Sequence, residues 1–370
     1  MGSGSGNGGE GSGPRRRVAL DQLRLGQGGS VALVAGDGAE AGDEAAAFAQ
    51  DRLGSAGAAG DAGAVGAAGP RTAVQYDAAC VAGGGERGAE VRDLVTGDHR
   101  HVLEDSGRRL LVRALATAEL PDVGPVVVAG GRDGSLRMWE LTRGSLVRGF
   151  PHCTGRIRTV AVGRAADGRQ VLLAGGDMAV VTVWDLATGA RLRTFTGHRG
   201  WVLATALTDG GAAPGIAISG DRRGDLLVWD VSTGRQRAAP ARRGGRIESV
   251  ATAVLPGERT VALSGGDGGE VRMWDLDRPE AAEPLTGLRR RVTALATARL
   301  PGGRVLAVGG GEDRRVVIWD LVTRQELAGP CHLPAAVSSI AACATGFVVA
   351  HEAGTASFTW CAELLAPLPG

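Results

Sequence analysis

The sequence predicts an all-β fold, a β-propeller, and two regularities carry that prediction. A tryptophan followed by an acidic and an aliphatic residue recurs at a constant interval of 45 residues, at Trp139, Trp184, Trp229, Trp274 and Trp319. Each interval also holds four short apolar or alternating segments, separated by turn residues at roughly 8–12-residue spacing. A period of about 40–45 residues with four strands is typical of propellers, in which every unit folds into one four-stranded sheet.

The four segments follow one another in a fixed order within each unit. A first strand is expected at 292–300 (VTALATARL), a turn at 300–303, and a second apolar run ending in small residues at 305–313. The alternating third strand with the tryptophan follows at 315–321, and a short fourth strand precedes the next copy, as at 190–197. Valine and leucine in the first two runs indicate the crowded inner part of a blade, whereas the half-polar third strand suggests an outer position.

One unit carries the most complete version of this pattern. It contains GHRGWVLATAL (197–207), ISGD (218–221) and LLVWD (226–230). These motifs resemble those of WD40-repeat proteins, and the resemblance covers about 71–370 and extends plausibly to 17–36. The Ala- and Arg-rich repeats look like actinobacterial members of that family. The resemblance implies a propeller of four antiparallel strands per blade around a central axis.

Two weaker copies flank the five regular ones and set the expected number of blades. Residues 83–97 match the second and third strands, with Arg92-Asp93 in the Trp-Asp place, and 347–364 match with Trp360-Cys361. They raise the number of third strands to seven. We therefore expect seven blades, the commonest closed form of the family that the chain resembles.

An eight-blade alternative stays open because 17–38 aligns with 291–312, which would make 48–53 an eroded eighth third strand. In the seven-blade interpretation, residues 17–25 instead add a strand to the last blade and close the ring. We assign 17–370 to the propeller, with an Ala/Gly-rich loop insertion at about 37–70. Residues 1–16, rich in Gly and Ser, are expected to form a disordered tail.

Composition narrows the function classes. A net charge of +1, from 41 basic and 40 acidic residues, gives no global attraction to nucleic acid or an anionic membrane. Five cysteines without a C-x-x-C pair or a Cys/His cluster favour a reducing cytoplasm over disulfides or a metal site. No apolar run reaches about 18 residues, so no membrane span is predicted. We predict no cofactor and no metal, and the sequence leaves the oligomeric state open.

Several repeated residues have a structural interpretation. In WD40 proteins the repeat tryptophan packs between blades, and a complete unit adds a His before the first strand and an Asp in the second turn. The resemblance implies the packing role for Trp139, Trp184, Trp229, Trp274, Trp319 and Trp360. Only His198 stands in a Gly-His pair. The turn Asp, six residues before the tryptophan, is present as Asp133 and Asp313, whereas Asp221 lies two residues earlier.

The candidate binding residues are arginines. The loops before the first strands carry Arg109, Arg156, Arg199, Arg246 and Arg291, and the turns between second and third strands carry Arg132, Arg223 and Arg315. The WD40 architecture places both sets of loops on one face, with acidic residues between the arginines. In one interpretation the arginines pair with those acids. In the other, some of them are free to bind an acidic protein segment or a phosphate.

The predicted function is a non-catalytic interaction scaffold or regulatory module that binds protein partners on this face. A ring of repeats offers many loops on one rigid surface. The alternative is an enzyme or a small-anion sensor with its site at the mouth of the central channel. That site would need converging polar residues, whereas the second strands end mostly in Gly and Ala. No catalytic residue is assigned, and the partner is not identified by the sequence.

Overall fold

The computed structural model describes twelve segments of the chain and gives them an all-β architecture. The described residues are 23–25, 80–85, 88–93, 99–103, 111–151, 153, 155–208, 215–238, 245–278, 282–327, 330–351 and 354–365. The predicted tail at 1–16 and insertion at 37–70 lie outside them. So do residues 48–53, on which the eight-blade alternative depends.

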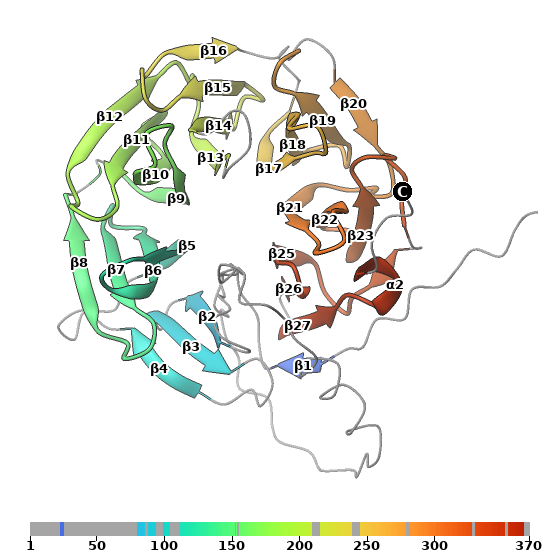
Figure 1. Cartoon of the computed structure of the whole chain (residues 1–370), viewed down its shortest axis with the longest axis horizontal. Helices are drawn as coiled ribbons and strands as arrows, with labels where there is room; N and C mark the ends of the chain where they lie inside the picture. The colour runs from blue at the N-terminus through green and yellow to red at the C-terminus, as the bar shows by residue number, and fades with distance from the viewer. Residues whose placement is uncertain are drawn as a thin grey trace, which may run out of the picture.

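The described strands form seven antiparallel sheets arranged in a ring, each with one strand at the centre of the ring and one at its rim (Figure 1). Six sheets have four strands and one has three described strands. We call each sheet a blade and name it by its strands. The ring therefore has the four-stranded propeller architecture that the repeat predicts.

The first three blades, each from its inner to its outer strand, have the following bounds: β2 (Cys80–Gly85), β3 (Gly88–Asp93) and β4 (His99–Leu103); β5 (Val112–Leu120), β6 (Gly124–Gly131), β7 (Leu136–Glu140) and β8 (Leu146–Phe150); β9 (Ile157–Arg164), β10 (Gln170–Gly176), β11 (Val180–Asp185) and β12 (Arg191–Thr196).

The next three blades have these bounds: β13 (Val202–Leu207), β14 (Ile216–Asp221), β15 (Leu226–Asp230) and β16 (Gln236–Ala238); β17 (Ile247–Val254), β18 (Thr260–Gly266), β19 (Val271–Asp275) and β20 (Ala282–Leu285); β21 (Val292–Arg299), β22 (Val305–Gly311), β23 (Arg315–Asp320) and β24 (Cys331–His332).

The last blade closes the ring with a strand from the other end of the chain. It contains β25 (Val337–Ala342), β26 (Gly346–His351) and β27 (Gly354–Thr359), followed by the short helix α2 (Ala362–Leu365). Strand β1 (Leu23–Leu25) pairs antiparallel with β27, in register from Leu23 opposite Ser357 to Leu25 opposite Thr355. The described part of 17–25 thus takes the predicted closing position.

The position of burial within a blade differs from the sequence-based expectation. The second strands β14, β18 and β22 are buried at every residue, as predicted. The third strands were expected to be outer, but β15 is buried at four of its five positions. The outer position belongs to the fourth strands, such as β12, which cover the third strands and are mostly exposed. The prediction was wrong because some polar residues in the third strands were taken as a sign of an outer position. A third strand can keep such residues while the fourth strand covers it.

The repeat tryptophans join neighbouring blades. Trp184 lies in one hydrophobic cluster with residues of the preceding β5–β8 blade, and its ring meets Phe150 edge-on at 6.4 Å. Trp229 stacks on Phe195 of its preceding blade at 5.1 Å. The side chains at all six predicted positions, Trp360 included, are at most 4% exposed. Among the described residues, packing across blade boundaries therefore forms six hydrophobic clusters, each shared by two neighbouring blades.

One blade has a polar network of four side chains that includes its tryptophan. In the β13–β16 blade the Ser219 hydroxyl accepts a hydrogen bond from Trp229 Nε1 at 2.8 Å and lies 2.6 Å from His198 Nε2. His198 Nδ1 lies 3.3 Å from a carboxylate oxygen of Asp221, and both side chains are fully buried. The carboxylate is thus eight residues before the tryptophan rather than six. The expected position is wrong here because Asp221 is the last residue of β14, where it reaches the loop before β13.

Replacing the shared hydroxyl should destabilise the protein. In Ser219→Ala, the buried Trp229 Nε1 and His198 Nε2 both lose their partner, and each orphaned group costs about 1–3 kcal/mol. We expect a larger loss of unfolding free energy than in Ser264→Ala, because Ser264 accepts a hydrogen bond from one indole, that of Trp274. Urea denaturation of both variants measures the difference. Equal losses would contradict the network.

Buried His198 should make stability depend on pH. Burial lowers the pKa of His198 below its ordinary value of 6.5, and the attraction of Asp221 offsets this only in part. Below about pH 6.5 the unfolded chain binds a proton that the folded chain does not, so the free energy of unfolding falls as pH decreases.

The expected loss is about 1 kcal/mol between pH 7.5 and 5.5 for one histidine. Urea denaturation at both pH values measures it. Burial also lowers the pKa of His351, so His198→Gln should reduce the pH dependence without abolishing it. A slope unchanged by the substitution would contradict this assignment.

Candidate functional site

The loops before the first strands and the turns between second and third strands meet at one face, as expected. The same backbone hydrogen bond joins them in five blades. For example, the amide of Asp177 donates to the carbonyl of Arg156, and that of Asp267 donates to Arg246. The equivalent donor in the β13–β16 blade is Arg222, and its acceptor is Trp201. We call this surface the loop face.

Most of the predicted binding arginines on the loop face have acidic partners. Arg291 Nε lies 2.8 Å from Asp267, and its Nη1 lies 3.1 Å from Glu312. The other pairs are looser: Arg156 with Asp177 at 3.8 Å, Arg199 with Asp225 at 3.6 Å, Arg246 with Glu248 at 3.7 Å and Arg315 with Asp313 at 4.0 Å. Exposed pairs of this kind contribute about 0–1 kcal/mol each.

The Asp267 carboxyl shows the effect of this pairing. Its partial burial would raise its pKa, but the Arg246 backbone amide and the Arg291 guanidinium donate hydrogen bonds to it. The balance holds the pKa of Asp267 below its ordinary value. Arg291 is therefore engaged within the molecule at neutral pH.

Several arginines of the loop face differ from these. Within the described residues, six are exposed and have no carboxylate within 4 Å: Arg132, Arg222, Arg223, Arg289, Arg290 and Arg314. Arg132 and Arg223 were predicted from the sequence, and Arg222 was not singled out. Arg109, also predicted, lies outside the described residues.

Trp201 distinguishes the surroundings of Arg222. The side chain is 38% exposed, and the guanidinium carbons of Arg158 and Arg222 lie 4.4 Å and 4.5 Å from its ring centroid. Such cation–π contacts contribute about 0.5–2 kcal/mol and fix the orientation of a guanidinium. The sequence contained a signal for Trp201: it occupies the repeat position, at 45-residue steps, where the other units have Arg156, Arg246 and Arg291.

An open pocket of about 410 Å³ lies beside this tryptophan. We call it the Trp201 pocket, and its lining residues are Asp177, Ala179, Arg199, Gly200, Trp201, Arg222 and Arg223. Arg199 is paired with Asp225, and Asp177 with Arg156 and Arg158. Arg222 and Arg223 thus add positive charge beside an aromatic surface.

The buried carboxylate of Asp221 holds the pocket in place. Its Oδ2 accepts hydrogen bonds from the amides of Arg199 and Gly200 at 3.3 and 3.2 Å. Its Oδ1 accepts from the amides of Arg223 and Asp225 at 2.8 and 2.9 Å. One side chain therefore connects the loop before β13 with the β14–β15 turn, and these two segments carry Trp201, Arg222 and Arg223.

The predicted turn aspartates make more local contacts. Asp133 Oδ1 accepts hydrogen bonds from the backbone amide and hydroxyl of Ser135. Asp313 accepts from the backbone amides of Arg289 and Arg315. Asp133 thus stabilises its own turn, whereas Asp313 also joins two loops, as Asp221 does.

The inner strands line the central channel, where the alternative function would need a cluster of polar residues. Their hydroxyls connect adjacent blades: Thr159 Oγ1 lies 2.9 Å from Thr205 Oγ1, and Thr252 Oγ1 donates to the Leu207 carbonyl at 3.0 Å.

No group of three or more His, Cys, Asp or Glu side chains that could hold a metal occurs in the described part of the chain. Nor does that part contain a helix with the length and apolar character needed to cross a bilayer.

Removing the Asp221 carboxylate should loosen the Trp201 pocket. In Asp221→Ala, four backbone amides lose their acceptor and buried His198 loses its neighbouring charge, so we expect a loss of about 2–4 kcal/mol of unfolding free energy. Hydrogen exchange should accelerate at the amides of 199, 200, 223 and 225. Asp133→Ala is the matched control, with an expected loss of about 1 kcal/mol. Unchanged exchange at those amides would contradict the role of Asp221.

Comparison with known proteins supports the fold. A computationally designed protein, Ika8, is similar with a TM-score of 0.58 and 22% identity over 78% of this chain and 82% of its own. The structure of U3-55K is similar with a TM-score of 0.59 and 19% identity over 72% of this chain and 82% of its own. No protein-family model and no curated protein sequence matches the chain. At these identities the similarity establishes a shared β-propeller fold.

Proposed function

We propose that this protein is a non-catalytic interaction scaffold of the WD40 type, with seven blades, that binds an acidic segment of a partner protein on its loop face. The observation that carries the proposal is the Trp201 pocket, where Arg222 and Arg223 lack carboxylate partners among the described residues. The predicted arginines Arg156, Arg199, Arg246, Arg291 and Arg315 have acidic neighbours. The further unpaired arginines Arg289, Arg290 and Arg314 have no cation–π contact among the described residues, so the pocket at Trp201 is distinguished by its aromatic ring.

The chemistry of the pocket favours a carboxylate ligand. A guanidinium that stacks on an indole keeps its N–H edge available, and that edge matches the two oxygens of a carboxylate. Arg222 stacks in this way on Trp201, and Arg223 follows it in the same turn. An acidic side chain would therefore meet two adjacent guanidinium groups.

The charge balance of the chain supports local recognition rather than general adhesion to anions. The net charge is +1, so the molecule as a whole has little attraction for polyanions. Two of the unpaired arginines of this face lie together in the Trp201 pocket, beside an exposed indole, so the pocket favours a partner that places an acidic side chain there. Arg132, in the corresponding turn of the β5–β8 blade, is exposed and provides a second contact of the same kind.

Binding can be tested with a fluorescein-labelled hexaglutamate peptide and fluorescence polarisation. In Arg222→Gln/Arg223→Gln, loss of the charge-assisted hydrogen bonds should weaken binding about tenfold or more, since such bonds contribute about 1.5–3 kcal/mol. Added salt should weaken binding to the wild type more than to the variant.

Arg291→Gln is the matched control. It also removes one guanidinium from the loop face, but Arg291 is already paired with Asp267 and Glu312. The affinity for the peptide should therefore change less than about twofold. A neutral hexaglutamine peptide should not bind. Equal weakening in the control and the double variant, or equal binding of both peptides, would refute the assignment of the pocket.

A further inference from the structure

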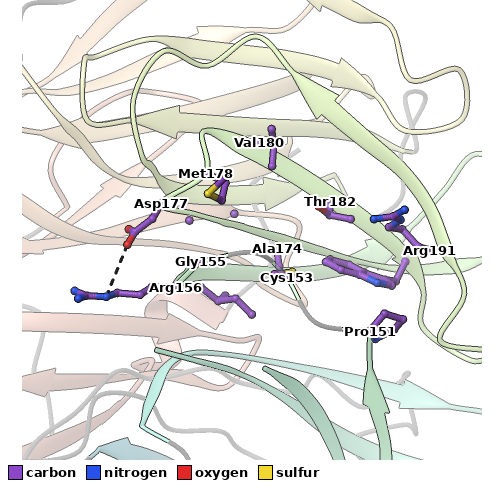
Figure 2. Close-up of a pocket in the computed structure, with 14 residues that line it drawn as sticks. Pro151, Cys153, Gly155, Arg156, Ala174, Asp177, Met178, Val180, Thr182 and Arg191 are labelled. Atoms are coloured by element: carbon purple, nitrogen blue, oxygen red, sulfur yellow. Dashed lines mark ion pairs between the residues drawn. The ribbon is translucent and has the colours of Figure 1, made fainter. Parts of the chain in front are cut away.

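A cavity of about 120 Å³ lies in the β9–β12 blade, beside the repeat tryptophan of that blade. Figure 2 shows Cys153 and Ala174 together within it, with Thr182 and Arg191 to one side. Arg156 and its ion-pair partner Asp177 lie at the other end of the group. The cavity is separate from the Trp201 pocket, although Asp177 belongs to the wall of both.

The next blade shows what fills this space elsewhere in the same chain. One 45-residue step separates Cys153 from His198 and Ala174 from Ser219. In the β13–β16 blade the Ser219 hydroxyl accepts the hydrogen bond of Trp229 Nε1, and the His198 ring, beside the same tryptophan, lies within hydrogen-bond distance of that hydroxyl. In the β9–β12 blade both side chains are shorter, and the space beside Trp184 is left as a cavity.

The shorter side chains also leave a polar group unsatisfied. Trp184 is 1% exposed and lines the cavity, and within the described part of the chain its Nε1 has no hydrogen-bond acceptor. An indole N–H can donate but cannot accept. Buried donors nearly always have a partner, so an unpaired one beside a cavity indicates a missing acceptor.

We propose that this cavity is a binding site for a small, neutral, planar ring that carries a hydrogen-bond acceptor, of the size and chemistry of imidazole. The acceptor nitrogen would take the hydrogen bond that Trp184 Nε1 leaves unmade. The wall also carries oxygen acceptors for the opposite ring N–H, Thr182 on one side of the cavity and Asp177 at the other end (Figure 2).

Size and charge both select this ligand class. Apolar cavities of about 150 Å³ in proteins bind a six-membered ring, so a cavity of about 120 Å³ suits a five-membered one. The wall includes Arg156 and Arg191, which disfavour a cation. Burial raises the pKa of the Cys153 thiol to about 11, against a smaller opposite effect of Arg191, so this thiol offers no counter-charge at neutral pH.

The test uses imidazole as the probe on the full chain. The ¹⁵N-labelled indole signal of Trp184, assigned with Trp184→Phe, should shift saturably as imidazole is added. The midpoint of thermal unfolding should rise over the same concentration range. Pyrrole is the matched probe, because its ring has the same size and an N–H but no acceptor nitrogen. It should bind at least tenfold more weakly.

Ala174→Ser is the matched variant. It restores the hydroxyl found at Ser219, satisfies Trp184 Nε1 and reduces the cavity, so imidazole affinity should fall at least tenfold while the fold is retained. Arg222→Gln/Arg223→Gln should leave imidazole binding unchanged, which separates this site from the Trp201 pocket. Cys153→His should also abolish binding, by placing a covalently attached imidazole there.

Three results would overturn the proposal. They are the absence of a saturable shift in the wild type, an equal affinity for pyrrole, and an unchanged affinity in Ala174→Ser. The first result would mean that water alone occupies the cavity and satisfies the indole.

Discussion

The geometry of the Trp201 pocket depends on one buried carboxylate. Asp221 is fully buried, and a charge in that position persists only if hydrogen bonds replace the water that it has lost. Four backbone amides from two different loops supply them, and His198 lies against the same group. Because the donors belong to the segments that carry Trp201, Arg222 and Arg223, satisfying the charge also fixes the geometry of the pocket. Asp221 therefore belongs both to the polar network inside the blade and to the support of the surface pocket.

The other blades show that the propeller does not need this network. Trp274 donates to Ser264, Trp319 to the Thr286 carbonyl, and Trp360 to the Cys343 carbonyl. Ser264 corresponds to Ser219, whereas Trp319 and Trp360 use backbone carbonyls, and all three rings pack against the preceding blade. Burial of large aromatic surfaces therefore maintains the ring, and the polar positions are free to vary. Variation of this kind left Trp184 with a cavity instead of an acceptor.

The sequence was sufficient for the ring but not for the site. A constant 45-residue period located the third strands, and the seven-blade interpretation anticipated that a strand within 17–25 would join the last blade, as β1 does. Spacing could not separate paired arginines from unpaired ones, because nearness in the sequence points the wrong way: Arg223 stands between Asp221 and Asp225, whereas Arg291 has no acid within several residues. What separates them is side-chain geometry: Arg291 reaches Asp267, whereas the acids near Arg223 are engaged with His198 and Arg199. Trp201 was overlooked because it breaks the arginine pattern, although that departure was its signal.

The β10–β11 turn connects the two sites that the structure distinguishes. Asp177 is paired with Arg156, which lines the cavity beside Trp184, and with Arg158, which stacks on Trp201. A ligand in the Trp201 pocket that attracts Arg158 would compete with Asp177 for that guanidinium, and a ligand in the cavity that hydrogen-bonds Asp177 would compete with Arg156 and Arg158 for the same carboxylate. Such a coupling would be reciprocal in free energy. It would run through Asp177 and Arg158 and not through Arg222 or Arg223, so substitution of those two arginines leaves the cavity intact.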